Sequence, residues 1–529
     1  MPASPRSFEP PAPRLSQRCH DALRSRGAVS LGVLCGMWFW LAVVAGSVGA
    51  DEPSGLAAAT ALEQTFIKVI EQAEPSVVSI ARDKVRTRVG DDFEEQRPLR
   101  RPRDDRSLSN PNYIPNEFGT GVVIRGDGLI LTNYHVVRGG PIAGKKGASE
   151  QELYVRLADR RGFPAQIFAA DPRSDLAILK IDAKGLQAIK LGNAERARKG
   201  QLVVTLGNPY ALARDGSVSA SWGIISNISR PAHLDLDQRD DDYHKKETIH
   251  HLGTLLQLDT RLNLGTSGGP VLNFRGEMIG LTTSLAAIAG YEKSAGFAMP
   301  LHDGTLRIIQ TLIRGEEVEY GFLGIEPNDV GQNDQEMQSL PAPLRQAGAA
   351  RVQNVFPNSP ADLGGLQRGD IILAMNNRPI FTRTDLTREV GFQAPETSVK
   401  FRVWRNYPPE VVDVSVPLGK WPVHDEDGIV ATRRRHPLWR GLGIDYNTAR
   451  FRHLPLQFRA RNIPRGVLIA EIEPLSTAAA AELQVGDFIT QVNGQAVTSP
   501  RQFYDAIRNL NGEAQLSLEN NRRVVLKAQ

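Results

Sequence analysis

The sequence predicts a mostly β chain in which two packed β-barrels precede two copies of a smaller α+β unit. Between residues 118 and 300, short apolar runs alternate with glycine-containing turns, a pattern typical of barrels. After residue 320, an apolar strand, a Leu-Gln-x-Gly-Asp turn and a short helix occur twice, which indicates a tandem repeat. Both observations favour strands over long helices as the main structural element.

The first 50 residues have the composition of a targeting segment. Four arginines between residues 14 and 26 precede an uncharged run from Gly27 to Ala50, which ends in small residues. This order predicts a secretory signal that is cleaved before Asp51. An uncleaved membrane anchor is the alternative, because the 24 residues from 27 to 50 are enough to span a bilayer. In either case we expect the rest of the chain to be exported.

Composition argues against several classes of function. A formal net charge of +4 is small for 529 residues and lies largely in local arginine runs, so it does not indicate nucleic-acid binding. Cys19 and Cys35 are the only cysteines, and both precede the expected cleavage site, which excludes disulfides, thiolate metal sites and a cysteine nucleophile after cleavage. We interpret His250-His251 as part of a solvated loop and expect no metal. No P-loop motif is present, so we expect no nucleotide or other cofactor.

The region before the barrels predicts a helix, a strand and a polar loop. Residues 56–73 have apolar side chains at helical spacing, and residues 75–80 read as the first strand. Residues 83–117 mix arginines, aspartates and prolines, which is typical of a loop. A helix that ends the domain is predicted at residues 301–314. The barrel strands before it are predicted at residues 118–124, 154–157, 165–168, 176–181, 202–207, 217–226, 255–259, 278–283 and 295–300.

A serine within a glycine-rich turn is the strongest candidate for catalysis. The stretch from Asn263 to Pro270 reads Asn-Leu-Gly-Thr-Ser-Gly-Gly-Pro and contains Ser267. A serine hydroxyl is a poor nucleophile at neutral pH, so it needs a base and donors for the developing oxyanion. The N–H groups of Gly265 and Ser267 can supply those donors, because glycines allow the required backbone angles. Alone, the motif could equally be an ordinary flexible turn.

A histidine and an aspartate in suitable settings precede this serine. His135 lies in Thr-Asn-Tyr-His-Val-Val directly after an apolar run, which would place it at the end of a core strand. Asp175 lies in a turn that enters the strand at residues 176–181. The order His135, Asp175, Ser267 is that of the chymotrypsin triad and differs from the subtilisin and α/β-hydrolase orders.

These three motifs resemble those of the HtrA/Deg family of serine proteases. The resemblance extends from about Gly119 to the C-terminus and implies a chymotrypsin-like double β-barrel followed by two PDZ domains. One departure is Thr266, where the family usually has asparagine; since this side chain is not a triad member, we expect tuning of the chemistry without its loss. The implied organisation is a signal peptide or anchor at 1–50, an N-terminal helix, strand and variable loop at 51–117, catalytic barrels at 118–315, PDZ domain 1 at 316–420, a linker at 421–439 and PDZ domain 2 at 440–529.

The two PDZ-like units carry candidate peptide-binding loops. Two pairs of repeated motifs have equal offsets, since 474−357 and 486−369 are both 117. A PDZ groove adds an extended peptide as a strand, and N–H groups of a glycine-containing loop bind its C-terminal carboxylate. The expected loop of the second unit is residues 440–443, because Gly-Leu-Gly-Ile at 441–444 is similar to Phe-Leu-Gly-Ile at 322–325. The alternative is that the second unit only packs against a neighbour and binds no peptide, because Glu482 replaces the usual small residue. The expected loop of the first unit consists of Gly321, Phe322, Leu323 and Gly324.

The substrate pocket is expected beside the strand that follows the nucleophile. Leu262, Thr283 and Leu285 would give it uncharged walls, which favours a small aliphatic residue before the scissile bond, as is also the family tendency. Arg261 lies six positions before Ser267, where trypsin-like enzymes set their charge preference. A buried unpaired arginine is costly, so we expect Arg261 to turn outward and pair with Asp259.

The function implied by these residues and the resemblance is that of an exported, ATP-independent serine endopeptidase. Its substrates would be unfolded or misfolded proteins, as in protein quality control under stress, and C-terminal peptides would bind the PDZ units. The family assembles as trimers or multiples of them. A membrane would be a partner only if the leader stays uncleaved, and we expect no nucleic-acid partner. Two alternatives are a non-proteolytic holdase chaperone or PDZ scaffold, whose signature would be a broken triad, and a secreted esterase, in which paired PDZ units have no evident role.

Overall fold

The computed structural model describes residues 55–84, 108, 115, 117–145, 151–208, 217–230, 248–283, 296–423, 428–453 and 463–528. The predicted leader and Leu285 of the predicted pocket therefore lie outside the described residues, as do most of the loop at 83–117. The chain divides into two units, residues 1–57 and 58–529, and the contacts discussed below lie within the second. No helix in the described ranges is both long and apolar enough to cross a membrane.

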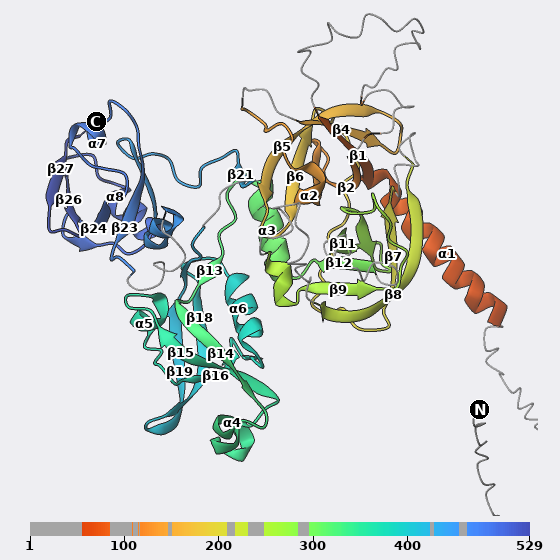
Figure 1. Cartoon of the computed structure of the whole chain (residues 1–529). Coiled ribbons are helices and arrows are strands. Elements are labelled where there is room, and N and C mark those ends of the chain that lie inside the picture. Colours follow the sequence, from red (N-terminus) through yellow and green to blue (C-terminus); the bar gives the residue numbers. More distant parts are fainter. Residues whose placement is uncertain are drawn as a thin grey trace, which may run out of the picture. The chain divides into compact units, whose positions relative to one another are not determined.

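The first barrel is closed by six antiparallel strands in the order β5-β4-β1-β2-β3-β6, with β5 also paired to β6 (Figure 1). Its inward positions are apolar and buried, as the alternating sequence pattern predicted. A short strand far along the chain, β21 (Val430–Ala431), adds to the outer edge of β5. The six strands are β1 (Val77–Lys84), β2 (Glu117–Arg125), β3 (Leu129–Asn133), β4 (Gln151–Leu157), β5 (Gly162–Asp171) and β6 (Leu176–Ile181).

The second barrel is also closed by six strands, in the order β10-β11-β12-β9-β8-β7 (Figure 1). The predicted terminal helix is α3 (Asp303–Ile313), and the predicted N-terminal helix is α1 (Gly55–Ala73). Phe66 of α1 packs against Trp222 and Phe274, with ring centroids 5.3 and 5.0 Å apart. The strands are β7 (Leu202–Gly207), β8 (Ser219–Arg230), β9 (Leu255–Leu258), β10 (Pro270–Leu272), β11 (Met278–Thr283) and β12 (Gly296–Pro300).

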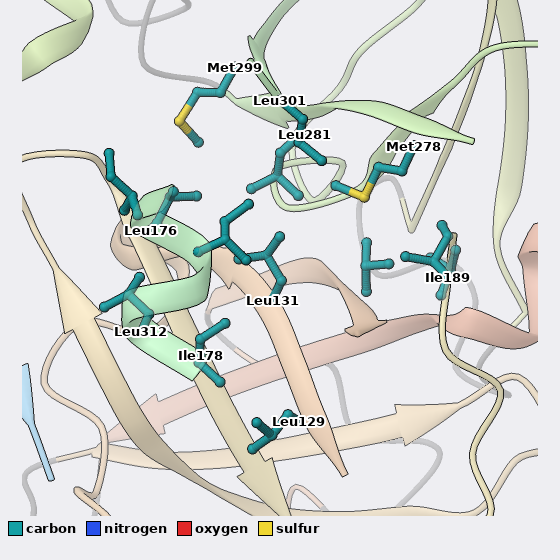
Figure 2. Close-up of a cluster of buried hydrophobic side chains, with 14 of the residues drawn as sticks. Leu129, Leu131, Leu176, Ile178, Ile189, Met278, Leu281, Met299, Leu301 and Leu312 are labelled. Carbon is teal, nitrogen blue, oxygen red and sulfur yellow. The ribbon is translucent and has the colours of Figure 1, made fainter. Parts of the chain in front are cut away.

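One apolar cluster joins the two barrels and α3 (Figure 2). Leu131 and Leu176 enter it from the first barrel, Leu281 and Met299 from the second, and Leu312 from α3, and all five side chains are at most 2% exposed. Each leucine buried in this way contributes about 1.5–3 kcal/mol relative to exposure. Leu131 and Leu176 are also close in sequence to His135 and Asp175, so the packing that joins the barrels also supports the candidate site.

The two α+β units have matching sheets, β14-β15-β16-β18-β19 and β22-β23-β24-β26-β27. The elements of the first unit are β13 (Gly321–Phe322), β14 (Ile325–Gly331), α4 (Gln335–Ser339), β15 (Gly348–Val355), α5 (Pro360–Gly364), β16 (Ile371–Met375), β17 (Arg378–Pro379), α6 (Arg383–Gly391), β18 (Ser398–Asn406), β19 (Pro409–Pro417) and β20 (Gly419–Lys420). Those of the second unit are β22 (Leu442–Tyr446), β23 (Val467–Ile472), α7 (Thr477–Ala480), β24 (Phe488–Val492), β25 (Gln495–Ala496), α8 (Pro500–Ile507), β26 (Ala514–Leu518) and β27 (Arg523–Leu526).

The structure corrects the register predicted between the two peptide-binding loops. A Cβ atom on Gly324 would lie 2.3 Å from Ser359 Cβ, and one on Gly441 would lie 2.2 Å from Ser476 Cβ. Gly324 is therefore equivalent to Gly441, an offset of 441−324 = 117 that agrees with the other repeated motifs. The loop of the second unit is residues 438–441, two positions before the predicted 440–443. The Gly-Leu-Gly-Ile match gave the wrong register because the position of each loop is set by the close packing of its glycine on a serine. The apolar residues shared by the two tetrapeptides do not set that position.

Candidate active site

The Asp175 carboxylate holds His135 at two points. Its Oδ1 accepts a hydrogen bond from His135 N at 3.0 Å, and its Oδ2 lies 2.8 Å from His135 Nδ1. Asp175 is fully buried, so water does not compete for these bonds. A carboxylate can only accept here, which assigns the proton to Nδ1 and leaves the lone pair on Nε2 to act as a base.

His135 lies slightly beyond the strand end at which the sequence placed it. Strand β3 ends at Asn133, and the histidine belongs to the one-turn helix α2 (Tyr134–Val137). Tyr134 N donates to Asp175 O at 2.9 Å, and Asn133 Nδ2 donates to the same carbonyl at 3.3 Å. The segment around the histidine is therefore fixed to the backbone of the acid as well as to its side chain.

Glycines on both sides shape the turn that carries Ser267. Gly265 and Gly268 have φ of 94° and 88°, which favours glycine. A Cβ on Gly265 would lie 2.4 Å from Asn208 O, and one on Gly268 would lie 2.0 Å from Thr120 O. The Thr266 hydroxyl donates to Asn263 O at 2.7 Å and so closes the turn. The threonine that departs from the family pattern thus has a structural partner within the turn.

Ser267 has the surroundings of an oxyanion-binding nucleophile. Ser267 is 7% exposed, and its hydroxyl has no hydrogen-bond partner within the described ranges. Catalytic hydrogen bonds are often long without substrate, so the lack of a bond to His135 does not argue against the pair. The N–H groups of Gly265 and Ser267 also donate to no acceptor in the described part of the chain, which leaves both available for an oxyanion.

Thr120 joins the serine turn to the first barrel, a role that the sequence did not indicate. Thr120 N donates to Ser267 O at 2.8 Å, and its Oγ1 donates to Gly265 O at 2.7 Å. The same Oγ1 accepts from Asn208 N at 3.0 Å, while Thr120 O accepts from Thr132 Oγ1 at 2.7 Å. Thr120 is completely buried. One residue of β2 therefore fixes the backbone of Ser267 relative to the strand that leads to His135.

The predicted pocket residues are only partly within the described structure. Thr283 ends β11 and is buried, and Leu262 is half-buried against Gly296, where a Cβ would lie 2.8 Å from Leu262 Cδ1. Arg261 turns outward as predicted, but the predicted pairing with Asp259 is wrong. Asp259 Oδ1 accepts from Ile224 N at 2.6 Å, a backbone donor that is already fixed, and Arg261 has no salt bridge within the described ranges.

The first peptide-binding loop is built on a short strand pair. Gly321 and Phe322 form β13, which pairs with β20. Leu323 is buried, its carbonyl accepts from Ala361 N at 2.9 Å, and Gly324 has φ of 83°. The loop thus leads directly into β14, whose pairing partner is β15. This is the arrangement that a PDZ loop requires beside a strand edge.

No group of three or more His, Cys, Asp or Glu side chains in the described ranges is placed to hold a metal ion.

Comparisons with known proteins agree on all three folded parts. A trypsin-like peptidase domain family matches residues 119–281, and two PDZ domain families match residues 321–416 and 468–519. A probable periplasmic serine endoprotease, DegP-like, of Pseudomonas putida strain GB-1 is 31% identical over 462 residues, covering 84% of this chain and 88% of the relative. Its counterpart in Halomonas elongata is 28% identical over 465 residues, covering 84% and 88%. Among solved structures, the HtrA-type protease AlgW with decapeptide is 26% identical and covers 68% of this chain and 99% of that chain, with a TM-score of 0.46.

We predict that Ser267→Ala removes nearly all peptide-bond cleavage without changing the fold, since the side chain makes no hydrogen bond in the described structure. By analogy with triad variants, the loss in turnover should be on the order of 10⁶. A fluorophosphonate should label the wild-type protein and not the variant, as detected by mass spectrometry. Cleavage by the variant at the wild-type rate would show that another residue is the nucleophile.

Proposed function

This chain belongs to the HtrA/Deg family of serine endoproteases, and from that premise we propose that it degrades unfolded or misfolded proteins without ATP in the periplasm. The observations that carry the catalytic part are the buried Asp175 carboxylate bound to His135 and the two available N–H donors in the turn of Ser267. Because the triad is complete, proteolysis is favoured over a purely holding chaperone. The periplasmic location and the DegP-like description are those of the relatives.

In the proposed mechanism, Ser267 Oγ attacks the peptide carbonyl carbon while His135 Nε2 takes its proton. The imidazolium is then stabilised by Asp175, and the same proton passes to the leaving amine. The developing oxyanion accepts hydrogen bonds from the N–H groups of Gly265 and Ser267. The same two N–H groups bind the second oxyanion, which forms when water attacks the acyl-enzyme. Support comes from the 2.8 Å contact that fixes the imidazole tautomer.

In the second PDZ unit, residues just before β22 lie beside the expected peptide groove. Trp439 and Leu442 exchange two backbone hydrogen bonds, of 3.0 and 2.8 Å, at the start of β22. His436 stacks on Tyr504 of α8 with ring centroids 4.3 Å apart. Residues 436–439 therefore contact both β22 and α8, the two elements between which a peptide would add. We assign peptide binding to the first PDZ unit for this reason.

The matched glycines test this assignment. In full-length Ser267→Ala protein, Gly324→Ala should weaken binding of a fluorescent peptide with an apolar C-terminus at least about tenfold, which is about 1.4 kcal/mol. Gly441→Ala places a Cβ equally close to a serine and has a similar φ of 84°, so it is the matched control and should leave the affinity unchanged. Equal losses in both variants would mean that the second unit binds peptide too.

The proposed specificity is cleavage after small aliphatic residues such as Val or Ala. The uncharged strand at Thr283, the apolar Leu262 and the outward Arg261 support it. We expect the peptides from a digested unfolded protein to end mainly in such residues, and Arg261→Ala to give the same pattern. Products that end mainly in Asp or Glu would show that Arg261 sets the specificity, and products that end in Lys or Arg would exclude both explanations.

Export with removal of the leader and assembly into a homotrimer, or a multiple of it, complete the proposal. The charge pattern before Asp51 supports cleavage, and the family resemblance supports the assembly. Mass spectrometry of protein from the periplasmic fraction should find an N-terminus at or near Asp51, and sedimentation should give a mass of three chains or a multiple. An intact leader in the membrane fraction would favour an anchor instead.

A further inference from the structure

The catalytic acid has a backbone conformation that the surrounding residues must maintain. Asp175 has φ of 53°, in the left-handed region that a residue other than glycine rarely adopts. Such a conformation costs about 1–3 kcal/mol and persists only where neighbouring contacts enforce it. The Asp175 carbonyl is held by Tyr134 N and Asn133 Nδ2, and its N–H donates to Pro172 O at 3.2 Å, so the turn before it supplies part of the restraint.

A second buried carboxylate, that of Asp171, organises these preceding residues. Its Oδ1 accepts from Arg173 Nε at 2.7 Å, and its Oδ2 accepts from Ser174 N and Ser174 Oγ at 3.1 and 2.8 Å. A further bond to Oδ2 comes from the Tyr320 hydroxyl. Asp171 and Ser174 are both at most 1% exposed. The turn that ends in Asp175 is thus folded around one carboxylate with four protein donors.

The backbone of this turn is also held from the second barrel. Ile249 N donates to Arg173 O at 2.9 Å, and His250 Nε2 donates to Ser174 O at 2.9 Å. His250 is buried, so the solvated loop predicted for it is wrong: its Nδ1 lies 2.6 Å from Thr254 Oγ1, and its Nε2 bonds the turn before Asp175. These contacts fix the carbonyl side of residues 173 and 174. The Asp171 carboxylate accepts from the Ser174 N–H, so both sides of the peptide unit between residues 173 and 174 are restrained.

Tyr320 is the member of this group that comes from outside the barrels. It follows α3 and directly precedes the peptide-binding loop Gly321–Gly324. Its ring lies 4.7 Å from the Arg173 guanidinium, and Arg173 also donates to Val318 O at 2.6 Å. Burial raises the pKa of Tyr320 well above its ordinary value, and Asp171 raises it further, so the phenol stays protonated and donates.

We propose that Tyr320 is a positioning residue for the catalytic acid, acting through Asp171 to hold Asp175 in its left-handed conformation against His135. The segment that leads into the first PDZ unit thereby completes the catalytic site. Tyr320 does not touch the reacting atoms, so its removal should change the rate of the chemical step and not substrate binding. This inference rests on the proposed endopeptidase function.

Tyr320→Phe tests the proposal because it keeps the ring and removes one hydrogen bond. We expect kcat for an unfolded protein and for a short peptide to fall about tenfold, within the 10²-fold that a misplaced catalytic group can cost, with KM unchanged. The rate of fluorophosphonate labelling should fall by the same factor. Tyr446→Phe is the matched control, since Tyr446 is also buried and its hydroxyl donates to the Glu396 carboxylate at 3.0 Å, far from the triad in sequence. It should keep the wild-type kcat.

Active-site titration separates positioning from misfolding. Labelling to completion counts competent sites, and kcat per titrated site should remain reduced in Tyr320→Phe. A wild-type kcat per site, or an increase in KM alone, would overturn the proposal and confine Tyr320 to packing. An equal fall of kcat in Tyr446→Phe would also overturn it, as a general effect of losing a buried tyrosine hydroxyl. If the wild-type protein neither cleaves nor becomes labelled, the proposed function itself fails, which is a distinguishable result.

Discussion

The catalytic residues come from two separate barrels, and the hydrogen bonds of Thr120 are what fix one barrel's contribution relative to the other's. Thr120 donates to the carbonyls of Gly265 and Ser267 and accepts from Asn208 N. Each such bond contributes only about 0.5–1.5 kcal/mol net, so the apolar cluster of Figure 2 supplies most of the free energy that holds the barrels together. The polar contacts select a single arrangement among those that the apolar packing allows, and catalysis depends on that selection.

The sequence was sufficient for the fold class, and it yielded hypotheses for the triad and the first peptide-binding loop, because each depends on a local pattern. Apolar alternation predicts strands, and the spacing of glycines around Ser267 predicts a strained turn. Thr120 could not be found in this way, since its partner Gly265 lies 145 residues away and a threonine in a strand carries no distinguishing mark. The second PDZ loop was misplaced by two residues although two other motifs already shared the offset of 117. A constant offset over several motifs is stronger evidence for register than one similar tetrapeptide.

The segment between the PDZ units illustrates the same limit. Its composition predicted a linker, yet Val430 is buried in the first barrel's core and pairs with Ala170 at the edge of β5. A Cβ on Gly428 would lie 2.0 Å from the Tyr134 hydroxyl, so the segment passes close to the residue before His135. An edge strand offers unpaired N–H and C=O groups to any extended segment of suitable length. Two residues are enough to use that edge but too few to show a strand period in the sequence.

A group of buried charged side chains surrounds Lys420, just before this segment begins. Lys420 is 4% exposed, and its ammonium lies 3.2–3.5 Å from the carboxylates of Glu317, Glu319 and Asp445. Burial raises the pKa of Glu319 by more than Lys420 and Arg435 lower it. A carboxylate whose pKa is raised by folding stabilises the folded state when the pH is below its pKa in the unfolded chain. That stabilisation is lost as the pH rises through its pKa in the folded state. The contribution of Glu319 to stability is therefore lost as the pH rises through its raised pKa in the folded state. We interpret this charged group as a determinant of which segments meet, because any other pairing would leave a buried charge without its partner.

The same reasoning explains why Asp171 is surrounded by four donors beside the catalytic acid: a buried carboxylate costs little only where each donor is in place, so it tolerates one geometry of the turn and disfavours the rest.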